Sequence, residues 1–377
     1  MFLAMRELWF ARTRFLLMGA VVALISILMV ILSGLSSGLV VDGVSALQRT
    51  PVQAFAFAEG TKADSAFSRS VVTEDQADTW RARPDVARAE LFGNTIVNAK
   101  TESGVPVDLT LFGIRPGSFL EPSVSEGAPL GGDTDVVLSD SARATGVELG
   151  DTIVVDRLGT RLDVVGFTSD KRTFGHVDVA YLPLSTWQEI HAGVRLGEQV
   201  PPSAYTEASV VAIEGVDGGA LPDLTAGDAA AGTTAKILEE SFDSSPGYSA
   251  EMMTMSMITA FLYAISALVV GAFFTIWTVQ RSREIAVLRA MGASTGFLLR
   301  DALLQAVIVL VGSVAVGVLV GLGLGSGLEG SGMPFVLESG PVARGAVLLV
   351  VLGLLGAALA VVRIVRVDPL AALGENR

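Results

Sequence analysis

The chain has 377 residues, of which 51% are hydrophobic and only 17% are charged, and its mean hydropathy is +0.57. This composition is too apolar for an ordinary soluble globular domain and indicates a membrane protein. Cysteine is absent, which excludes disulfide bonds and thiolate metal sites. The formal net charge of -13 would argue against a nucleic-acid partner if it were evenly spread, and its distribution along the chain is more informative than its total.

Residues 1–14 and 15–41 form the first predicted elements. In 1–14, large apolar side chains stand among few charges, which predicts an interfacial helix on the inner membrane face, with a frayed tail as the alternative. The uncharged run 15–41 follows and predicts the first transmembrane helix. A cleaved signal peptide is the alternative, but this run is longer than a typical signal core and no clear A-x-A site follows it.

Four uncharged stretches are each long enough to cross a hydrocarbon layer of about 30 Å at about 1.5 Å per residue. The last and shortest relies on Arg344 and Arg363 reaching toward the two interfaces. The predicted transmembrane helices are 15–41, 252–280, 302–328 and 345–362.

Arginines near the ends of these helices predict the orientation, because Lys and Arg are retained on the cytoplasmic side. Segments 1–14, 281–301 and 363–377 together carry ten basic and five acidic side chains, a net charge of +5, so the rest of the chain carries -18. We therefore expect a multi-pass protein of the cell membrane with both termini in the cytoplasm. Residues 42–251 and a short loop at 329–344 lie outside in this topology.

Residues 42–251 are rich in Asp, Gly, Ser, Thr and Pro, with short alternating apolar runs, which indicates a mixed α/β domain. Segments 215–233 and 241–249 look like loops or linkers. The predicted fold class is an integral membrane α-helical protein with four transmembrane helices and one α/β extracytoplasmic domain between the first and second. Within this domain we expect strands at 136–138, 153–155, 162–166 and 177–183, a helix capped by Ser139 or Asp140, and another capped by Ser185 or Thr186.

The outer domain shows little sign of enzyme chemistry. His176 and His191 are the only histidines, and a metal site would need a third ligand that the sequence does not indicate. We interpret both as surface or core residues. No G-x-S-x-G or H-E-x-x-H motif is present, and none of the four lysines follows a glycine, so there is no P-loop for ATP. We predict that the chain is not an enzyme and has no metal site of its own.

The cytoplasmic loop 281–301 is the most informative segment. Ile285, Leu288 and Met291 can form the apolar side of a short helix, which Gly292 would end. Ser294 can then cap the next helix. A plain helical connector, whose arginines only enforce topology, is the alternative on spacing alone.

This loop resembles the R-x-x-E-I-x-x-L-[KR]-A-x-G-A segment of the FtsX-like permease domain in MacB/FtsX-type ABC transporters. The tail 362–376, with Asp368 and Pro369 before Ala371, resembles the family's D-P-x-x-A-L ending. Segment 134–190 is similar to the extracytoplasmic core domain. The residues that match the loop pattern are Arg281, Glu284, Ile285, Leu288, Arg289, Ala290, Gly292 and Ala293.

The resemblance implies a homodimeric permease in membrane lipid, bound to two cytoplasmic ABC ATPase subunits that hydrolyse the ATP. No intrinsic cofactor is implied. The expected function is efflux, with an FtsX-like signalling subunit that controls an extracellular hydrolase as the alternative. A membrane-tethered binding domain would leave the loop unexplained. The residues expected to couple to the ATPase are Arg281, Arg283, Glu284, Ile285, Leu288, Arg289 and Gly292.

Small residues in two of the predicted spans indicate close helix packing. We expect the homodimer interface at spans 15–41 and 252–280, with packing inside one subunit as the alternative. The small residues are Ser33, Gly34, Ser36, Ser37 and Gly38 in the first span and Gly312, Gly317, Gly321, Gly323 and Gly325 in the third.

The chain looks most like the haem-exporter permeases of the family, so haem is the expected cargo. Phe55 and Phe57 are candidates to pack on a porphyrin, and Glu59 could ligate its iron. A lipid, peptide or drug cargo remains open, as does a purely structural role for these residues. The further substrate-binding candidates are Met252, Met253, Met255 and Met257, of which Met252 and Met253 are the first candidates for iron ligands.

Overall fold

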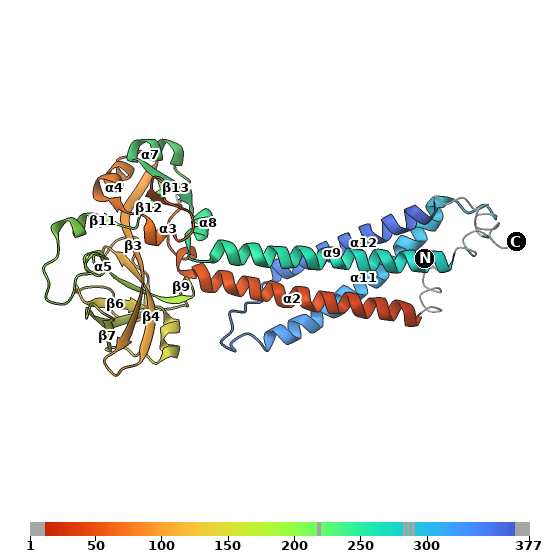
Figure 1. The fold of residues 1–377 in the computed structure, drawn as a ribbon, viewed down its shortest axis with the longest axis horizontal. Coiled ribbons are helices and arrows are strands. Elements are labelled where there is room, and N and C mark those ends of the chain that lie inside the picture. Colours follow the sequence, from red (N-terminus) through yellow and green to blue (C-terminus); the bar gives the residue numbers. More distant parts are fainter. Residues whose placement is uncertain (1–11, 217–219, 282–283, 285–286, 288–290, 366–377) are drawn as a thin grey trace. The chain divides into compact units, whose positions relative to one another are not determined.

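The computed structural model describes residues 12–216, 220–281, 284, 287 and 291–365 (Figure 1). The chain divides into two compact units, each described by itself below. The membrane unit comprises Met1–Leu39 and Met252–Arg377, and the outer unit comprises Val40–Glu251.

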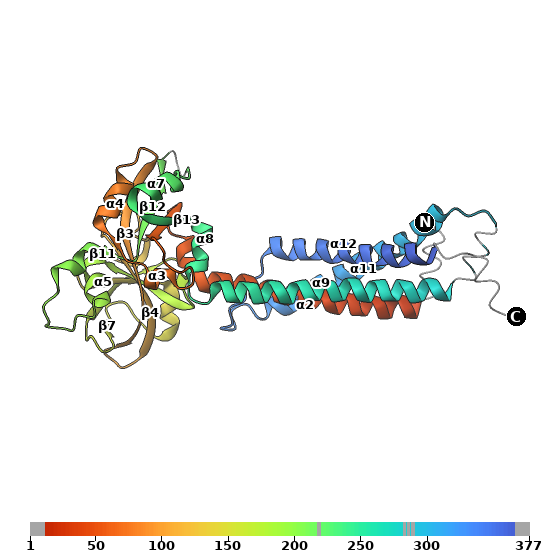
Figure 2. The same cartoon turned by 45° about the horizontal axis from the view of Figure 1, so that its top comes forward.

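Four helices build the membrane unit, and each is long and apolar enough to cross a membrane. Helices suit lipid because they satisfy their backbone hydrogen bonds internally. The two views in Figures 1 and 2 show the four running alongside one another. Together with the α/β outer unit, they confirm the predicted fold class. Their bounds are α2 Arg12–Gln48, α9 Tyr248–Gln280, α11 Thr295–Ser326 and α12 Ser339–Val365.

Two of these helices are longer than the uncharged runs that predicted them. α2 continues to Gln48, and α9 begins at Tyr248, so both extend into the outer unit. Ser294 caps α11 as expected, since its side chain accepts a hydrogen bond from the Phe297 amide. The core between the helices contains Val22, Val30, Phe274, Leu310 and Leu349.

The outer unit is built on an 11-stranded sheet in the described part of the chain, with the path β13-β1-β12-β3-β4-β10-β6-β8-β5. β7 pairs with β3 and β8, and β9 pairs with β10. The strands on the path are β13 Thr233–Ile237, β1 Ala54–Ala58, β12 Val210–Gly215, β3 Val86–Thr101, β4 Pro106–Ile114, β10 Val177–Pro183, β6 Asp135–Leu138, β8 Arg161–Thr168 and β5 Val124–Gly127. Off it lie β7 Thr152–Val155 and β9 Thr173–Phe174, and β2 Val72–Thr73 pairs with β11 Glu207–Ala208.

Short helices accompany the sheet, and three of them correct the sequence-based expectations. The helix expected after Ser139 is a 3-10 turn, Asp140–Thr145. The next expected helix starts at Leu184, ahead of the predicted caps Ser185 and Thr186. The linker-like segment 215–233 contains α7, which the Asp223 side chain caps. The α-helices are α3 Ala66–Arg69, α4 Glu74–Arg81, α5 Leu184–His191, α7 Leu224–Ala231 and α8 Leu238–Ser241.

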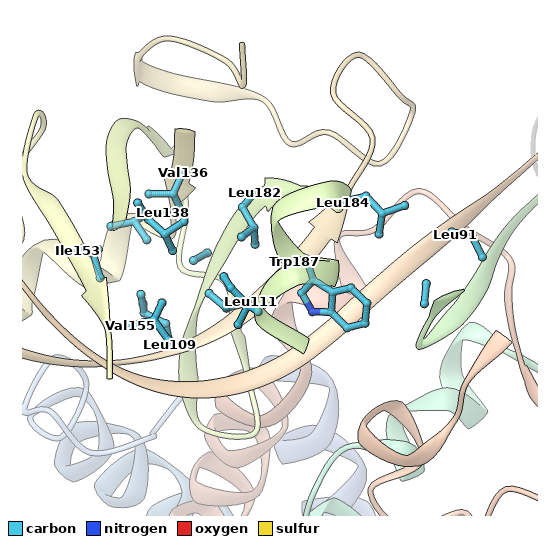
Figure 3. Packing of buried hydrophobic residues seen from close by; sticks show 14 of the residues in the cluster. Leu91, Leu109, Leu111, Val136, Leu138, Ile153, Val155, Leu182, Leu184 and Trp187 are labelled. Carbon is cyan, nitrogen blue, oxygen red and sulfur yellow. The ribbon is translucent and has the colours of Figure 1, made fainter. Parts of the chain in front are cut away.

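The outer unit has two hydrophobic cores, because alternate residues of β3 point to opposite faces of the sheet. Leu91 belongs to an aliphatic core, and the neighbouring Phe92 to an aromatic one. Figure 3 shows residues of the core that contains Leu91, which also includes Trp187 of α5. A Cβ added at Gly93 or Gly113 would lie 2.2 or 2.5 Å from atoms of Trp187, so both strands need glycine beneath this side chain.

Candidate functional site

The described part of the loop 281–301 follows α9 directly. The Arg281 guanidinium lies 5.5 Å from the centre of the Trp277 ring, and its Nε donates to Glu284 Oε2 at 3.0 Å. Gly292 has φ +96°, a left-handed conformation that suits glycine after a helix. The other predicted coupling residues, Arg283, Ile285, Leu288 and Arg289, lie outside the described residues, as does the tail 366–377.

The first turn of α2 and the last turns of α9 are joined by side chains. Arg14 donates a hydrogen bond to Gln280. The ring of Phe15 packs edge-on against Trp277, with centroids 4.9 Å apart, and also contacts Phe273. A displacement of the loop after Gln280 would therefore act on both helices together.

The small residues of α2 pack inside this one chain. A Cβ at Gly34 would lie 2.3 Å from the ring of Phe335, and one at Gly38 would lie 2.1 Å from the Pro334 carbonyl oxygen. The Val336 amide donates to the Gly34 carbonyl at 3.0 Å. The outer loop between α11 and α12 thus occupies the small-residue face of α2, which favours the alternative of packing within one subunit at these two glycines.

Two glycines of α11 also serve contacts within the chain. A Cβ at Gly317 would meet the Ala23 carbonyl oxygen at 2.4 Å, and one at Gly321 would meet Val30 at 2.8 Å. Gly312 differs, since no atom of the described chain lies within 4 Å of where its Cβ would be. The glycines of this span therefore form no single interaction face.

The methionines at the start of α9 fall on different faces of the helix. Met253 and Met257 are 67% and 51% exposed, and Phe261, one further turn along, is 65% exposed. This spacing of four residues places the three side chains on one face of the helix. Met252 and Met255 are partly buried.

Phe55 and Phe57 do not offer their rings to a ligand. Both are buried, and both rings contact Phe67 within the aromatic core, with centroids 5.3 and 5.0 Å apart. Their strand, β1, lies between β12 and β13, and both of its faces are covered. Glu59 follows in an exposed turn of the outer unit, whereas the four methionines belong to the membrane unit. The expectation that these phenylalanines line a porphyrin site is corrected accordingly.

The two histidines differ in their surroundings. His191 stacks on Trp187 at 4.6 Å and forms a hydrogen bond with Thr95. Burial lowers the pKa of His191. His176 lies instead between two carboxylates, Asp42 and Glu251. Among the described residues, no group of three or more His, Asp or Glu side chains is arranged to hold a metal ion.

Sequence reasoning missed two contacts that bear on function. Pro334 and Phe335 cover α2, and their only sequence signal was the pair of glycines four residues apart on that helix. The position of His176 depends on pairing that the sequence does not show, because Asp42 and Glu251 are 134 and 75 residues away.

Residues 256–369 match the family model described as FtsX-like permease C-terminal. The C-terminal part of this chain is similar to FtsX-like permease domains. The matched segment covers most of α9, all of α11 and α12, and the loop whose pattern resembled this family. The comparison confirms that resemblance.

Relatives match along the whole chain. A Staphylococcus epidermidis protein that carries the name hemin transport system permease protein HrtB is 23% identical over 376 residues, covering 100% of this chain and 99% of the relative. A Mycobacterium bovis ABC transporter permease, whose name gives no substrate, is 23% identical over 377 residues and covers 99% of both chains. These similarities support an ABC transporter permease of the FtsX type.

Two solved structures are similar to part of the chain. The extracellular domain of a noncanonic ABC-type transporter, YknZ, from Gram-positive bacteria has 14% identity and a TM-score of 0.34, covering 49% of this chain and 98% of that one. The periplasmic region of MacB from Actinobacillus actinomycetemcomitans has 15% identity and a TM-score of 0.36, covering 53% and 92%.

Proposed function

We propose that this chain is the permease subunit of an ATP-driven exporter. It works as a homodimer in the cell membrane, with both termini in the cytoplasm, and two separate ATPase subunits supply the energy. The observation that carries the proposal is the FtsX-like permease domain over residues 256–369, which contains the cytoplasmic loop. The sequence has no P-loop lysine, which is consistent with ATP hydrolysis in a partner.

The cytoplasmic loop is the proposed entry point for this energy. Arg281 is fixed by Trp277 on one side and Glu284 on the other, directly after the last turn of α9. The Glu284 side chain is largely exposed and so is available to a partner. Arg14 and Gln280 link the cytoplasmic ends of α2 and α9, so a push on the loop is passed to both helices. This is a mechanical coupling, and it needs no chemistry within the permease.

Haem is the proposed cargo. Relatives that span the whole chain carry the name of hemin transport permeases, and α9 presents two exposed methionines above an exposed phenylalanine. A thioether sulfur is an established axial ligand for haem iron, and an aromatic ring packs well against a porphyrin face. Met253, Met257 and Phe261 are the candidates that the structure leaves accessible.

A two-fold axis would duplicate this methionine face. In a homodimer every contact occurs twice, so the sulfur atoms of two α9 helices can approach one iron from opposite sides. The apolar remainder of the face would bury the porphyrin edge away from water. Phe55 and Phe57 take no part in this site, because they belong to the outer core.

Titration of haemin into the purified full-length protein in detergent tests the cargo. We expect a shift of the Soret band in the wild type that weakens strongly in a Met253→Leu/Met257→Leu double variant. Leucine keeps the apolar volume and removes the sulfur. Met333→Leu is the matched control, since Met333 is also 51% exposed but lies in the outer loop, and it should bind as the wild type does. An unshifted wild-type spectrum would remove haem from consideration.

A further inference from the structure

The chain passes between its two units at only two places, and both lie inside helices. One is between Leu39 and Val40 in α2, and the other is between Glu251 and Met252 in α9. Any movement carried along the backbone from one unit to the other must therefore pass through the outer end of α2 or the first turn of α9. Both ends meet a single side chain of the outer unit, His176.

His176 is within hydrogen-bond distance of both helices. Its Nδ1 lies 2.9 Å from Asp42 Oδ2 on α2, and its Nε2 lies 3.2 Å from Glu251 Oε1 on α9. Both carboxylates are acceptors when ionised, so both contacts require N–H groups on the ring. The imidazolium has two such groups, whereas neutral imidazole has one and turns a lone pair toward the other carboxylate. This geometry is complete only when His176 is protonated.

The backbone at this position is strained for a histidine. His176 has φ +65° and follows Gly175, with φ +60°, in the two-residue turn between β9 and β10. Turns of this kind favour glycine or asparagine, because a side chain in the left-handed region is unfavourable. Strain of this sort persists only where surrounding contacts hold it in place.

The hairpin that carries His176 is itself fastened to α2. The Gly175 amide donates to the Gly43 carbonyl at 2.9 Å, and the Thr173 amide donates to Ser45 Oγ at 2.9 Å. These backbone contacts fix the hairpin on one helix. The contact with Glu251 is then what ties that assembly to α9.

The charged groups that face the ring come from both helices. Asp42 faces it from α2 and also pairs with Lys171, whose Nζ lies 2.6 Å from Asp42 Oδ1. Glu251 faces it from α9, where Tyr248 packs close to Gly43. Asp178 lies two residues after His176, on β10, and burial raises the pKa of its carboxyl group. The two ring nitrogens face different carboxylates, so a single metal ion could not take the place of both N–H groups.

We propose that His176 is a proton-operated clasp between the outer ends of α2 and α9. When protonated it donates to Asp42 and Glu251 at once and holds the two helix ends together. When neutral it keeps one hydrogen bond and releases the other helix. Protonation of the ring therefore closes the clasp, and loss of the proton opens it. This inference does not depend on the identity of the cargo.

Hydrogen exchange of the full-length protein tests the clasp, with the Gly175 amide as the reporter of the hairpin. Exchange is measured at pH 5.5 and pH 8, and each rate is corrected for its intrinsic pH dependence. We expect protection of the segment 172–178 to be roughly fivefold higher at pH 5.5, the effect of one partly exposed charge pair. Equal protection at the two pH values would overturn the proposal.

Three variants complete the test. His176→Asn keeps the left-handed turn, which asparagine tolerates, and should show no pH dependence. Glu251→Gln places an amide N–H where it can donate to the lone pair of a neutral imidazole. Protection of the hairpin in this variant should therefore also change little with pH. His191→Asn, the matched control at the other histidine, should respond as the wild type does. Retention of the full pH effect in His176→Asn would assign it to another group and refute the clasp.

Discussion

The contact between the outer loop and α2 gives the sharpest test of the packing described for the membrane unit. Alanine at Gly34 would place its Cβ 2.3 Å from the Phe335 ring, and alanine at Gly38 would place it 2.1 Å from the Pro334 carbonyl oxygen. Both distances are far below van der Waals contact, so the loop must move. Overpacking of this kind lowers the free energy of unfolding by about 1–3 kcal/mol, whereas replacing a helical glycine by alanine raises it by about 0.5–1 kcal/mol.

The free energy of unfolding should therefore fall by about 1 kcal/mol in Gly34→Ala and by about 2 kcal/mol in Gly38→Ala. The second is larger because a backbone carbonyl cannot rotate away as a ring can. Gly312→Ala is the matched control, since it is the same change in a membrane helix with no described atom within 4 Å of the new Cβ. It should leave stability unchanged or slightly raised. SDS-induced unfolding of the purified protein measures all three.

A double-mutant cycle with Phe335→Ala separates the two contacts. Removing the ring makes room for a Cβ at Gly34, so Gly34→Ala should cost nothing in that background. Gly38→Ala should keep most of its cost, because its obstacle is the Pro334 carbonyl and the Phe335 amide rather than the ring. Wild-type stability of both alanine variants, or equal rescue of the two, would refute this account of the loop.

Three further changes follow from other parts of the chain. Leu288→Asp places a charge in the predicted apolar docking helix and should abolish ATPase association, as judged by co-purification; unchanged association would count against the loop. Trp187→Ala removes the side chain that fills the space above Gly93 and Gly113 and should destabilise the outer unit by about 3–5 kcal/mol in thermal unfolding. The lowered pKa of His191 means that the unfolded chain binds more protons than the folded one just below pH 6.5, so stability is full above that value and falls as the pH drops through it. His191→Asn should reduce this loss of stability between pH 7.5 and 5.5. If the variant loses as much stability as the wild type over this range, a group other than His191 is responsible.

The membrane helices were predictable because lipid leaves one strong signal, a long run without charge. The same signal did not reveal the ends of α2 and α9, because both helices extend beyond the apolar run to include the charged residues Asp42 and Glu251. α7 was missed because Gly227 and its alanines read as a linker. That glycine is needed for packing, since a Cβ there would lie 2.0 Å from the Trp80 ring.

The candidate sites depended more on tertiary structure than the sequence could reveal. Phe55 and Phe57 alternate with alanines, as in a strand with one face exposed, but β12, β13 and the aromatic core cover both faces of β1. The clasp at His176 needs a strained turn and two distant carboxylates, and neither leaves a local pattern. The loop motif was predictable because it is contiguous in the sequence.

Reconstitution tests the central claim most directly. The permease and the ATPase subunit with which it co-purifies are placed in proteoliposomes loaded with haemin, and haemin transfer to an external apoprotein is followed with and without ATP. We predict transfer that requires ATP and the ATPase, that is lost with Leu288→Asp, and that is strongly reduced with Met253→Leu/Met257→Leu. ATP hydrolysis stimulated by the permease without any haemin transfer would contradict the export of haem.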